Sequence, residues 1–98
     1  MSPEIKNTEM GLLVSGAIHF SNVLRLRRRG DRLIRNNIGI EIQVDLSGVT
    51  SSDVSGLSLL LRWMHYAKKQ GKRVHYISIP LSLLKVARIC GINEMISE

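Results

Sequence analysis

The chain has 98 residues, 44% of them hydrophobic and 22% charged, a composition typical of one globular domain spanning residues 1–98. No apolar run approaches the roughly 18 residues of a membrane-spanning helix, and residues 1–9 lack the pattern of a secretory signal, so we expect a cytoplasmic protein. The single cysteine, Cys90, excludes an internal disulfide framework, and its apolar neighbours predict a buried helix residue.

Two strands and a helix are predicted in the first third of the chain. Residues 3–8 form a marginal edge strand and residues 11–18 a better one, in which Gly16 indicates a bulge. Residues 22–36 then form a helix capped by Ser21 or Asn22, although Gly30 weakens it by about 1 kcal/mol relative to Ala. Its expected core stripe is thin and consists of Val23, Leu26, Leu33 and Ile34.

The same predicted helix carries nearly half of the basic residues of a chain whose formal net charge is +6. They are Arg25, Arg27, Arg28, Arg29, Arg32 and Arg35. Because they are spread around the helix they cannot all be buried, so they form a solvated surface or face an acidic protein or an anionic membrane. Nucleic acid is the least favoured partner, since no aromatic residue is interleaved with the arginines to stack on bases.

The clearest strand pattern runs from Ile38 to Leu46. Ile38, Ile40, Ile42, Val44 and Leu46 alternate with polar residues and glycine. This period of two predicts one buried and one polar face. A strand covered by helices on both faces would instead be apolar throughout. We therefore expect a two-layer α/β domain, with helices mainly on one face of the sheet.

A cluster of small hydroxyl residues at 47–53 is predicted to end this strand and to start the central helix. Asp53 is the preferred N-cap, with Ser51 and Ser52 as alternatives. The helix extends from Val54 to about Gln70, because Lys68, Lys69 and Gly71 form a cationic last turn and a stop. Its apolar stripe is Leu57, Leu60, Leu61 and Met64.

The last elements are a strand over residues 73–79 and a helix that Pro80 and Ser82 open and that ends near Cys90. The strand completes a crossover unit with the strand at 38–46, so the two strands should be parallel. The helix has Leu83, Val86, Ala87 and Cys90 at helical spacing and Gly91 after its end. We expect it to pack beside the central helix.

The chain contains the residue types of a catalytic triad, in Asp45, Asp53, Ser55, His65 and His75, but not the G-x-S-x-G sequence of a nucleophile elbow. No pair of cysteines and histidines has zinc-ligand spacing, and no phosphate-binding loop motif is present. We therefore expect a binding module with no cofactor and no metal, rather than an enzyme.

Three segments together resemble the STAS domain family, the fold of anti-sigma-factor antagonists: Val44-Asp45-Leu46-Ser47, then Asp53-Val54-Ser55-Gly56-Leu57, and Ala67-Lys68-Lys69-Gln70-Gly71. The helix ending is most similar to the small cytoplasmic STAS subunits of bacterial lipid-asymmetry (Mla) ABC transporters. The resemblance implies a mixed sheet of four to five strands. It also implies a partner-binding site at the start of the central helix.

At that site, family members carry a Ser or Thr directly after the Asp, which is phosphorylated in the antagonists and faces the ATPase in the transporter subunits. Here the position is Val54, so the phosphorylation switch does not carry over. Ser55 is a weak substitute because it points about 100° away around the helix. The expected partner-binding residues are Thr50, Ser51, Ser52, Asp53, Val54, Ser55 and Leu57. Turn and capping chemistry alone is the competing explanation for the hydroxyl residues.

The resemblance implies a non-catalytic subunit that binds and stabilises or regulates the ATPase of a phospholipid-transporting ABC complex at the inner membrane. The alternative is an anti-sigma-factor antagonist that binds an anti-sigma kinase, and Val54 favours the transporter subunit because an antagonist needs its switch. A stress-signalling module with another partner is a third possibility. The sequence also leaves open a peripheral contact with anionic lipid. A homodimer is compatible with the sequence, but no feature of the sequence indicates one.

Overall fold

The computed structural model of the chain describes residues 3–92 and 96, which contain a mixed sheet in the order β1-β2-β3-β4. The strands are β1 (Glu4–Asn7), β2 (Gly11–Ile18), β3 (Glu41–Ser52) and β4 (Arg73–Ile77). β1 pairs antiparallel with β2, whereas β2 with β3 and β3 with β4 are parallel. The expected edge strand, bulge at Gly16 and parallel crossover are confirmed, since the register of β2 shifts between Gly16 and Ala17.

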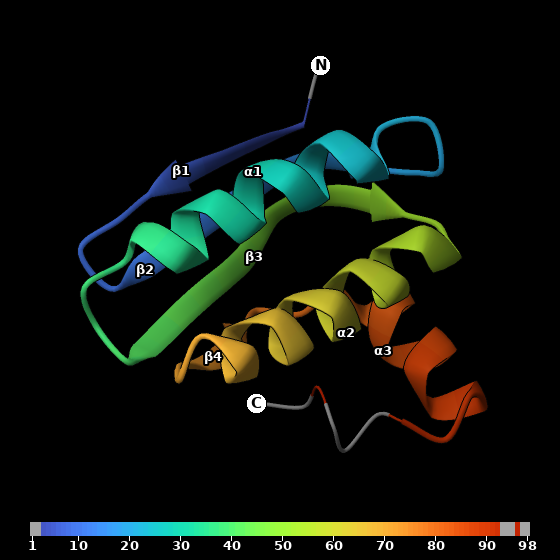
Figure 1. The fold of residues 1–98 in the computed structure, drawn as a ribbon. Helices are drawn as coiled ribbons and strands as arrows, with labels where there is room; N and C mark the ends of the chain where they lie inside the picture. The colour runs from blue at the N-terminus through green and yellow to red at the C-terminus, as the bar shows by residue number, and fades with distance from the viewer. Residues whose placement is uncertain (1–2, 93–95, 97–98) are drawn as a thin grey trace.

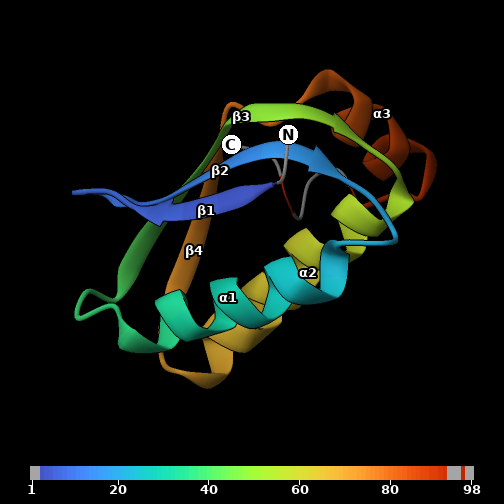
Figure 2. The ribbon, with the colours of Figure 1, turned by 90° about the horizontal axis from the view of Figure 1, so that it is seen from above.

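Three helices accompany the sheet in the described residues: α1 (Val23–Asn36), α2 (Val54–Lys69) and α3 (Leu81–Ile89). α1 and α2 lie side by side on one face of the sheet, and α3 lies near the carboxyl end of β3 (Figures 1 and 2). α3 contacts both α2 and β3. The predicted two-layer α/β architecture, with helices mainly on one face, is therefore confirmed.

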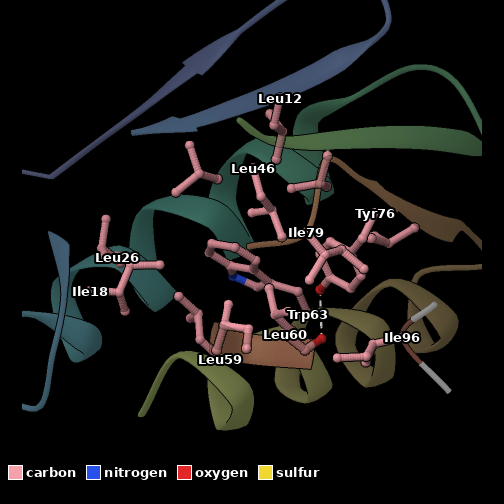
Figure 3. Close-up of a cluster of buried hydrophobic side chains, with 14 of the residues drawn as sticks. Leu12, Ile18, Leu26, Leu46, Leu59, Leu60, Trp63, Tyr76, Ile79 and Ile96 are labelled. Carbon is pink, nitrogen blue, oxygen red and sulfur yellow. Dashed lines mark hydrogen bonds between the residues drawn. The ribbon is translucent and has the colours of Figure 1, made fainter. Parts of the chain in front are cut away.

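The core lies between the sheet and the α1–α2 pair. Each strand contributes its inward residues, among them Ile5, Leu12, Val14, Ile42, Val44, Leu46, Val74 and Tyr76, and α2 contributes Leu57, Leu59, Leu60, Trp63 and Ala67. Figure 3 shows Trp63 between the sheet residue Leu46 and the α2 residues Leu59 and Leu60, with the hydroxyl of Tyr76 directed at the α2 backbone. That hydroxyl donates a 2.6 Å hydrogen bond to the Leu60 carbonyl, which satisfies the polar atom that Tyr76 buries.

Gly30 and Trp63 decide how closely α1 approaches α2. A Cβ atom on Gly30 would lie 2.3 Å from two carbon atoms of the Trp63 indole, so only glycine leaves room for this fully buried ring. The indole N–H also points back at α1 and lies 3.4 Å from the Arg27 carbonyl oxygen. The glycine that weakens α1 as an isolated helix is therefore what lets the helix pack.

The prediction for the start of β3 is wrong. Pairing begins at Glu41, opposite Arg73, and the preceding Ile38 and Ile40 are 103% and 67% exposed. Residues 37–39 instead form a turn in which the Gly39 N–H donates to the Asn37 side chain over 2.8 Å. The alternating pattern thus begins at Ile38, before the point at which β4 provides residues to pair with.

Two further expectations are corrected. The hydroxyl-rich segment does not end β3 near Leu46, because residues up to Ser52 pair with β2 and so have backbone partners. Cys90 is exposed rather than buried, since α3 ends at Ile89 and Cys90 takes the C-cap position before Gly91, which has a φ of +74°. The buried residues of α3 are Leu83 and Ala87.

Replacement of Gly30 by alanine tests the close approach of α1 and α2. In an exposed helix this change stabilises by about 1 kcal/mol, but here the added methyl meets the indole. We expect Gly30→Ala to lower the free energy of unfolding by about 1–3 kcal/mol, which is the usual effect of overpacking. Urea denaturation measures this change. In a Trp63→Leu background, Gly30→Ala should destabilise the protein much less. An equal destabilisation in both backgrounds would contradict the conclusion that the added methyl group meets the Trp63 indole.

Candidate functional site

The carboxylate of Asp53 links the starts of both layer helices. One oxygen, Oδ1, accepts the Ser55 N–H over 2.8 Å and so caps α2, which confirms Asp53 as its N-cap. The other, Oδ2, accepts the Phe20 N–H over 3.0 Å from the loop that leads into α1. The Asp53 N–H donates to the Ile18 carbonyl at the end of β2. One residue thereby fixes the end of β2, the loop before α1 and the first turn of α2.

The loop between β2 and α1 is held from its other side by Asn22. Its side chain accepts the His19 N–H and donates to the Ala17 carbonyl, at 3.1 and 3.0 Å. Asn22 therefore occupies the N-cap position of α1 but bonds the loop rather than the helix. Phe20, between these restraints, is 85% exposed.

The partner-binding residues expected from the sequence divide into an exposed set and a buried residue. Val54 is 61% exposed in the first turn of α2. Thr50, Ser51 and Asp53 are also exposed, and Ser52 and Ser55 are half-buried. Leu57 is only 4% exposed and belongs to the core, so its expected place on the binding surface is wrong. Its inward position follows from the helical stripe that it shares with Leu60.

Gly56 explains why the first turn of α2 lies so close to the end of β3. A Cβ atom at this position would lie 1.9 Å from Ser52 Oγ and 3.2 Å from the Leu83 side chain of α3. The Ser52 hydroxyl instead donates to the Asp53 carbonyl over 2.9 Å. The glycine of the Asp-Val-Ser-Gly-Leu segment thus keeps the end of β3, α2 and α3 in contact.

A groove of about 280 Å³ runs between α1 and α2 beside this helix start. We call it the docking groove, and its lining residues are Val23, Leu24, Arg27, Ser55, Ser58, Leu59 and Arg62. Leu24 is 48% exposed there, so the groove joins an accessible apolar side chain of α1 to the hydroxyls of α2. Leu24 was not expected at the site from the sequence, although an apolar residue among arginines is a signal that the sequence carries.

Two guanidinium groups line the groove without full complements of partners. Arg62 forms a 3.0 Å ion pair with Asp31 of α1, and its guanidinium carbon lies 5.2 Å from the Tyr66 ring centroid. The Nε atoms of Arg27 and Arg62 are buried with no hydrogen-bond partner among the described residues. Arg27 is therefore half-buried and does not belong to the solvated surface expected from the sequence. The other five arginines of α1 are exposed: Arg25, Arg28, Arg29, Arg32 and Arg35.

The residue types of a triad are not brought together. Both His65 and His75 are exposed, and His75 contacts Glu41 on the polar face of the sheet. Ser55 is bonded to Asp53 as a capping pair, and no hydrogen bond among the described residues joins it to a histidine. The described part of the chain also contains no cluster of three or more metal-ligand side chains. None of its helices has the length and hydropathy that crossing a membrane requires.

The family model described as "Mlab, STAS domain" matches residues 1–97. The chain belongs to this STAS family. No match is found among curated proteins.

Solved structures share the STAS fold of this MlaB-like chain. A chain of the Acinetobacter MlaFEDB complex in an ATP-bound conformation is 24% identical, with a TM-score of 0.78, over 90% of this chain and 92% of that one. The anti-sigma factor antagonist SpoIIAA in its unphosphorylated form is 15% identical, with a TM-score of 0.74, over 98% and 86% of the two chains. An antagonist-like protein from Thermotoga maritima is 13% identical, with a TM-score of 0.74, over 97% of this chain and 83% of that one.

The two hydrogen bonds of Asp53 can be separated by substitution. Asp53→Asn keeps an acceptor for the α2 cap but loses the second oxygen that holds Phe20, whereas Asp53→Ala loses both. We expect the urea midpoint at pH 7 to fall from wild type to Asp53→Asn and further to Asp53→Ala. Equal midpoints for wild type and Asp53→Asn would show that the bond to Phe20 contributes nothing, and equal midpoints for the two variants would show the same for the α2 cap.

The same residue predicts a pH dependence. Desolvation raises the pKa of Asp53, but the N–H groups of Ser55 and Phe20 outweigh it, and the net pKa is lowered. A lowered folded-state pKa gives stability that is present above the unfolded value of about 4 and is lost as the pH falls through the folded value. The stability difference between wild type and Asp53→Asn, followed by urea denaturation, should therefore shrink below about pH 4. A constant difference down to pH 2 would contradict this.

Proposed function

We propose that this STAS domain is a non-catalytic docking subunit that binds the ATPase of an ABC transporter through the start of α2 and the docking groove. The observation that carries the proposal is Val54, an apolar side chain that is 61% exposed at the position where the family resemblance expects a phosphorylatable residue. An exposed valine in the first helical turn favours a constant apolar contact over a charge switch.

The groove supports the same role. It is concave, it combines apolar side chains with hydroxyls and guanidinium groups, and its α2 lining begins at Ser55, the residue after Val54. Small apolar depressions that hold one side chain of a partner are typical centres of protein interfaces. Because Asp53 fixes both helix starts, the groove is preorganised and little ordering entropy is lost on binding.

Binding at this site would act by population shift. A subunit that binds one arrangement of an ATPase more tightly than another favours that arrangement by the difference in affinity, and no chemistry is needed on its own residues. The similar chain in the Acinetobacter MlaFEDB complex supports an ABC ATPase as the partner. We propose a cytoplasmic location, held at the inner membrane through this partner, in support of phospholipid transport.

An anti-sigma-factor antagonist that binds an anti-sigma kinase is the second candidate. The fold similarity to SpoIIAA over nearly the whole chain supports it, and Ser55 offers a half-buried hydroxyl next to the family position. Val54 weighs against it, because a valine cannot accept phosphate and the switch that releases such a partner would be missing.

Substitution of Val54 by glutamate tests the proposal. The side chain is exposed, so the fold should remain intact, and an acidic residue is favourable at a helix amino terminus. In co-purification from detergent-solubilised native membranes, we expect the wild-type protein to recover an ABC ATPase. Val54→Glu should lower the amount of ATPase recovered by at least about tenfold.

The matched control is Ile38→Glu, which makes the same change at another exposed aliphatic residue, in the turn between α1 and β3. It should leave recovery of the ATPase unchanged. Recovery of a soluble kinase with no ATPase, or equal losses for both variants, would contradict the proposed function. Leu57→Asp is unsuitable as a binding variant, because it places a charge in the core and should unfold the protein.

A further inference from the structure

The positive charge of the molecule is concentrated in the layer formed by α1 and α2. These two helices contain nine of the 14 basic residues and one of the eight acidic ones, and so carry a formal charge of +8. The whole chain carries +6, which leaves −2 for everything else. A field polarised in this way draws anionic partners toward one face of the molecule.

Four arginines lie in one row on the outer side of α1, which we call the arginine stripe: Arg25, Arg28, Arg32 and Arg35. They recur every three or four residues, the spacing of neighbours on one helix face. All four are exposed. None takes part in the ion pairs found among residues 3–92 and 96. Like charges at this spacing weaken a helix, and the one carboxylate of α1, that of Asp31, forms its ion pair with Arg62 of α2.

The stripe is continuous with the docking groove. A second hollow of about 470 Å³ lies over the first half of α1 and is lined by Ser21, Leu24, Arg25, Arg28, Arg29 and Arg32. Leu24 lines the docking groove as well, so the two depressions meet at this half-exposed side chain. A chain segment that places an apolar residue in the groove therefore passes directly onto Arg25 and Arg28.

We infer that the arginine stripe binds an acidic segment of a partner protein, whose aliphatic side chains occupy the docking groove beside Leu24 and whose carboxylates meet Arg25, Arg28 and Arg32. The inference rests on the proposed function for the role of the groove. A guanidinium offers a planar fork of donors that matches a carboxylate, which suits an exposed row of arginines to Asp and Glu side chains.

The alternatives fit the described surface less well. A helix that lies on a bilayer inserts an apolar face, but the apolar face of α1, with Leu26 and Ile34, is buried in the core. Only Leu24 and the preceding Phe20 remain as large exposed apolar residues near the stripe. Single-stranded nucleic acid needs aromatic side chains on which bases stack, and α1 contains none.

Fluorescence polarisation with a defined probe tests the inference. The probe is a labelled 12-residue peptide of four Glu-Glu-Leu repeats, and its comparison peptide replaces every Glu by Gln. We expect the wild-type protein to bind the acidic peptide in a salt-dependent manner and to bind the Gln peptide far more weakly. Arg28→Glu combined with Arg32→Glu should weaken binding of the acidic peptide by at least about tenfold.

The control pair is Lys85→Glu with Arg88→Glu, which makes the same change in net charge on the exposed side of α3. It should change the affinity by less than about twofold, and circular dichroism should show both double variants folded. Equal losses for the two pairs would overturn the inference, because the peptide would then sense only net charge. Tighter binding to vesicles containing phosphatidylglycerol than to the peptide, abolished by the α1 pair, would also overturn it and assign the stripe to a membrane surface.

The inference and the proposed function fail in different ways. If the acidic peptide binds the stripe but no ABC ATPase co-purifies with the wild-type protein, the stripe retains its assignment and the proposed function is wrong. If the ATPase co-purifies and its recovery is insensitive to Arg28→Glu with Arg32→Glu, the proposed function stands and the arginine stripe has no part in it.

Discussion

The geometry of the candidate docking surface depends on one carboxylate, that of Asp53. Its two oxygens hold the first turn of α2 and the loop before α1, which belong to segments 33 residues apart in the chain. Two glycines complete the arrangement: Gly30 lets α1 approach Trp63, and Gly56 lets α2 approach the end of β3. Because the two hydrogen bonds join both helix starts to one carboxylate and the glycine contacts leave no room for a side chain, the two helix starts form a rigid unit rather than two independent ends.

This rigidity changes the meaning of Val54. In a STAS domain with a Ser or Thr at this position, charge can be added and removed at the helix start, and the partner responds. An exposed valine on the same rigid support provides only shape and apolar area. The electrostatic part of the surface comes from the α1 arginines, which remain charged throughout the physiological pH range.

The helices and strands were predicted well from the sequence where local residue patterns determine them. They were predicted less well where their limits depend on residues that are distant in the chain. Asp53 as a cap and the helix from Val54 follow from local chemistry, as does the inward face of β3 from Ile42. The exposure of Ile38 and the continuation of β3 to Ser52 depend on where β4 and β2 provide pairing partners, which no local pattern encodes. The docking groove was missed because it needs α1 and α2 side by side, which the thin α1 stripe does not reveal.

Site-specific photo-crosslinking tests the central claim most directly. A benzophenone amino acid placed at position 54 in cells reports which protein touches the first turn of α2, and the same group at position 38 serves as a control on an exposed turn. The account predicts that position 54, and not position 38, crosslinks to an ABC ATPase identified by mass spectrometry. A crosslink from position 54 to an anti-sigma kinase, or equal crosslinking of the ATPase from both positions, would contradict it.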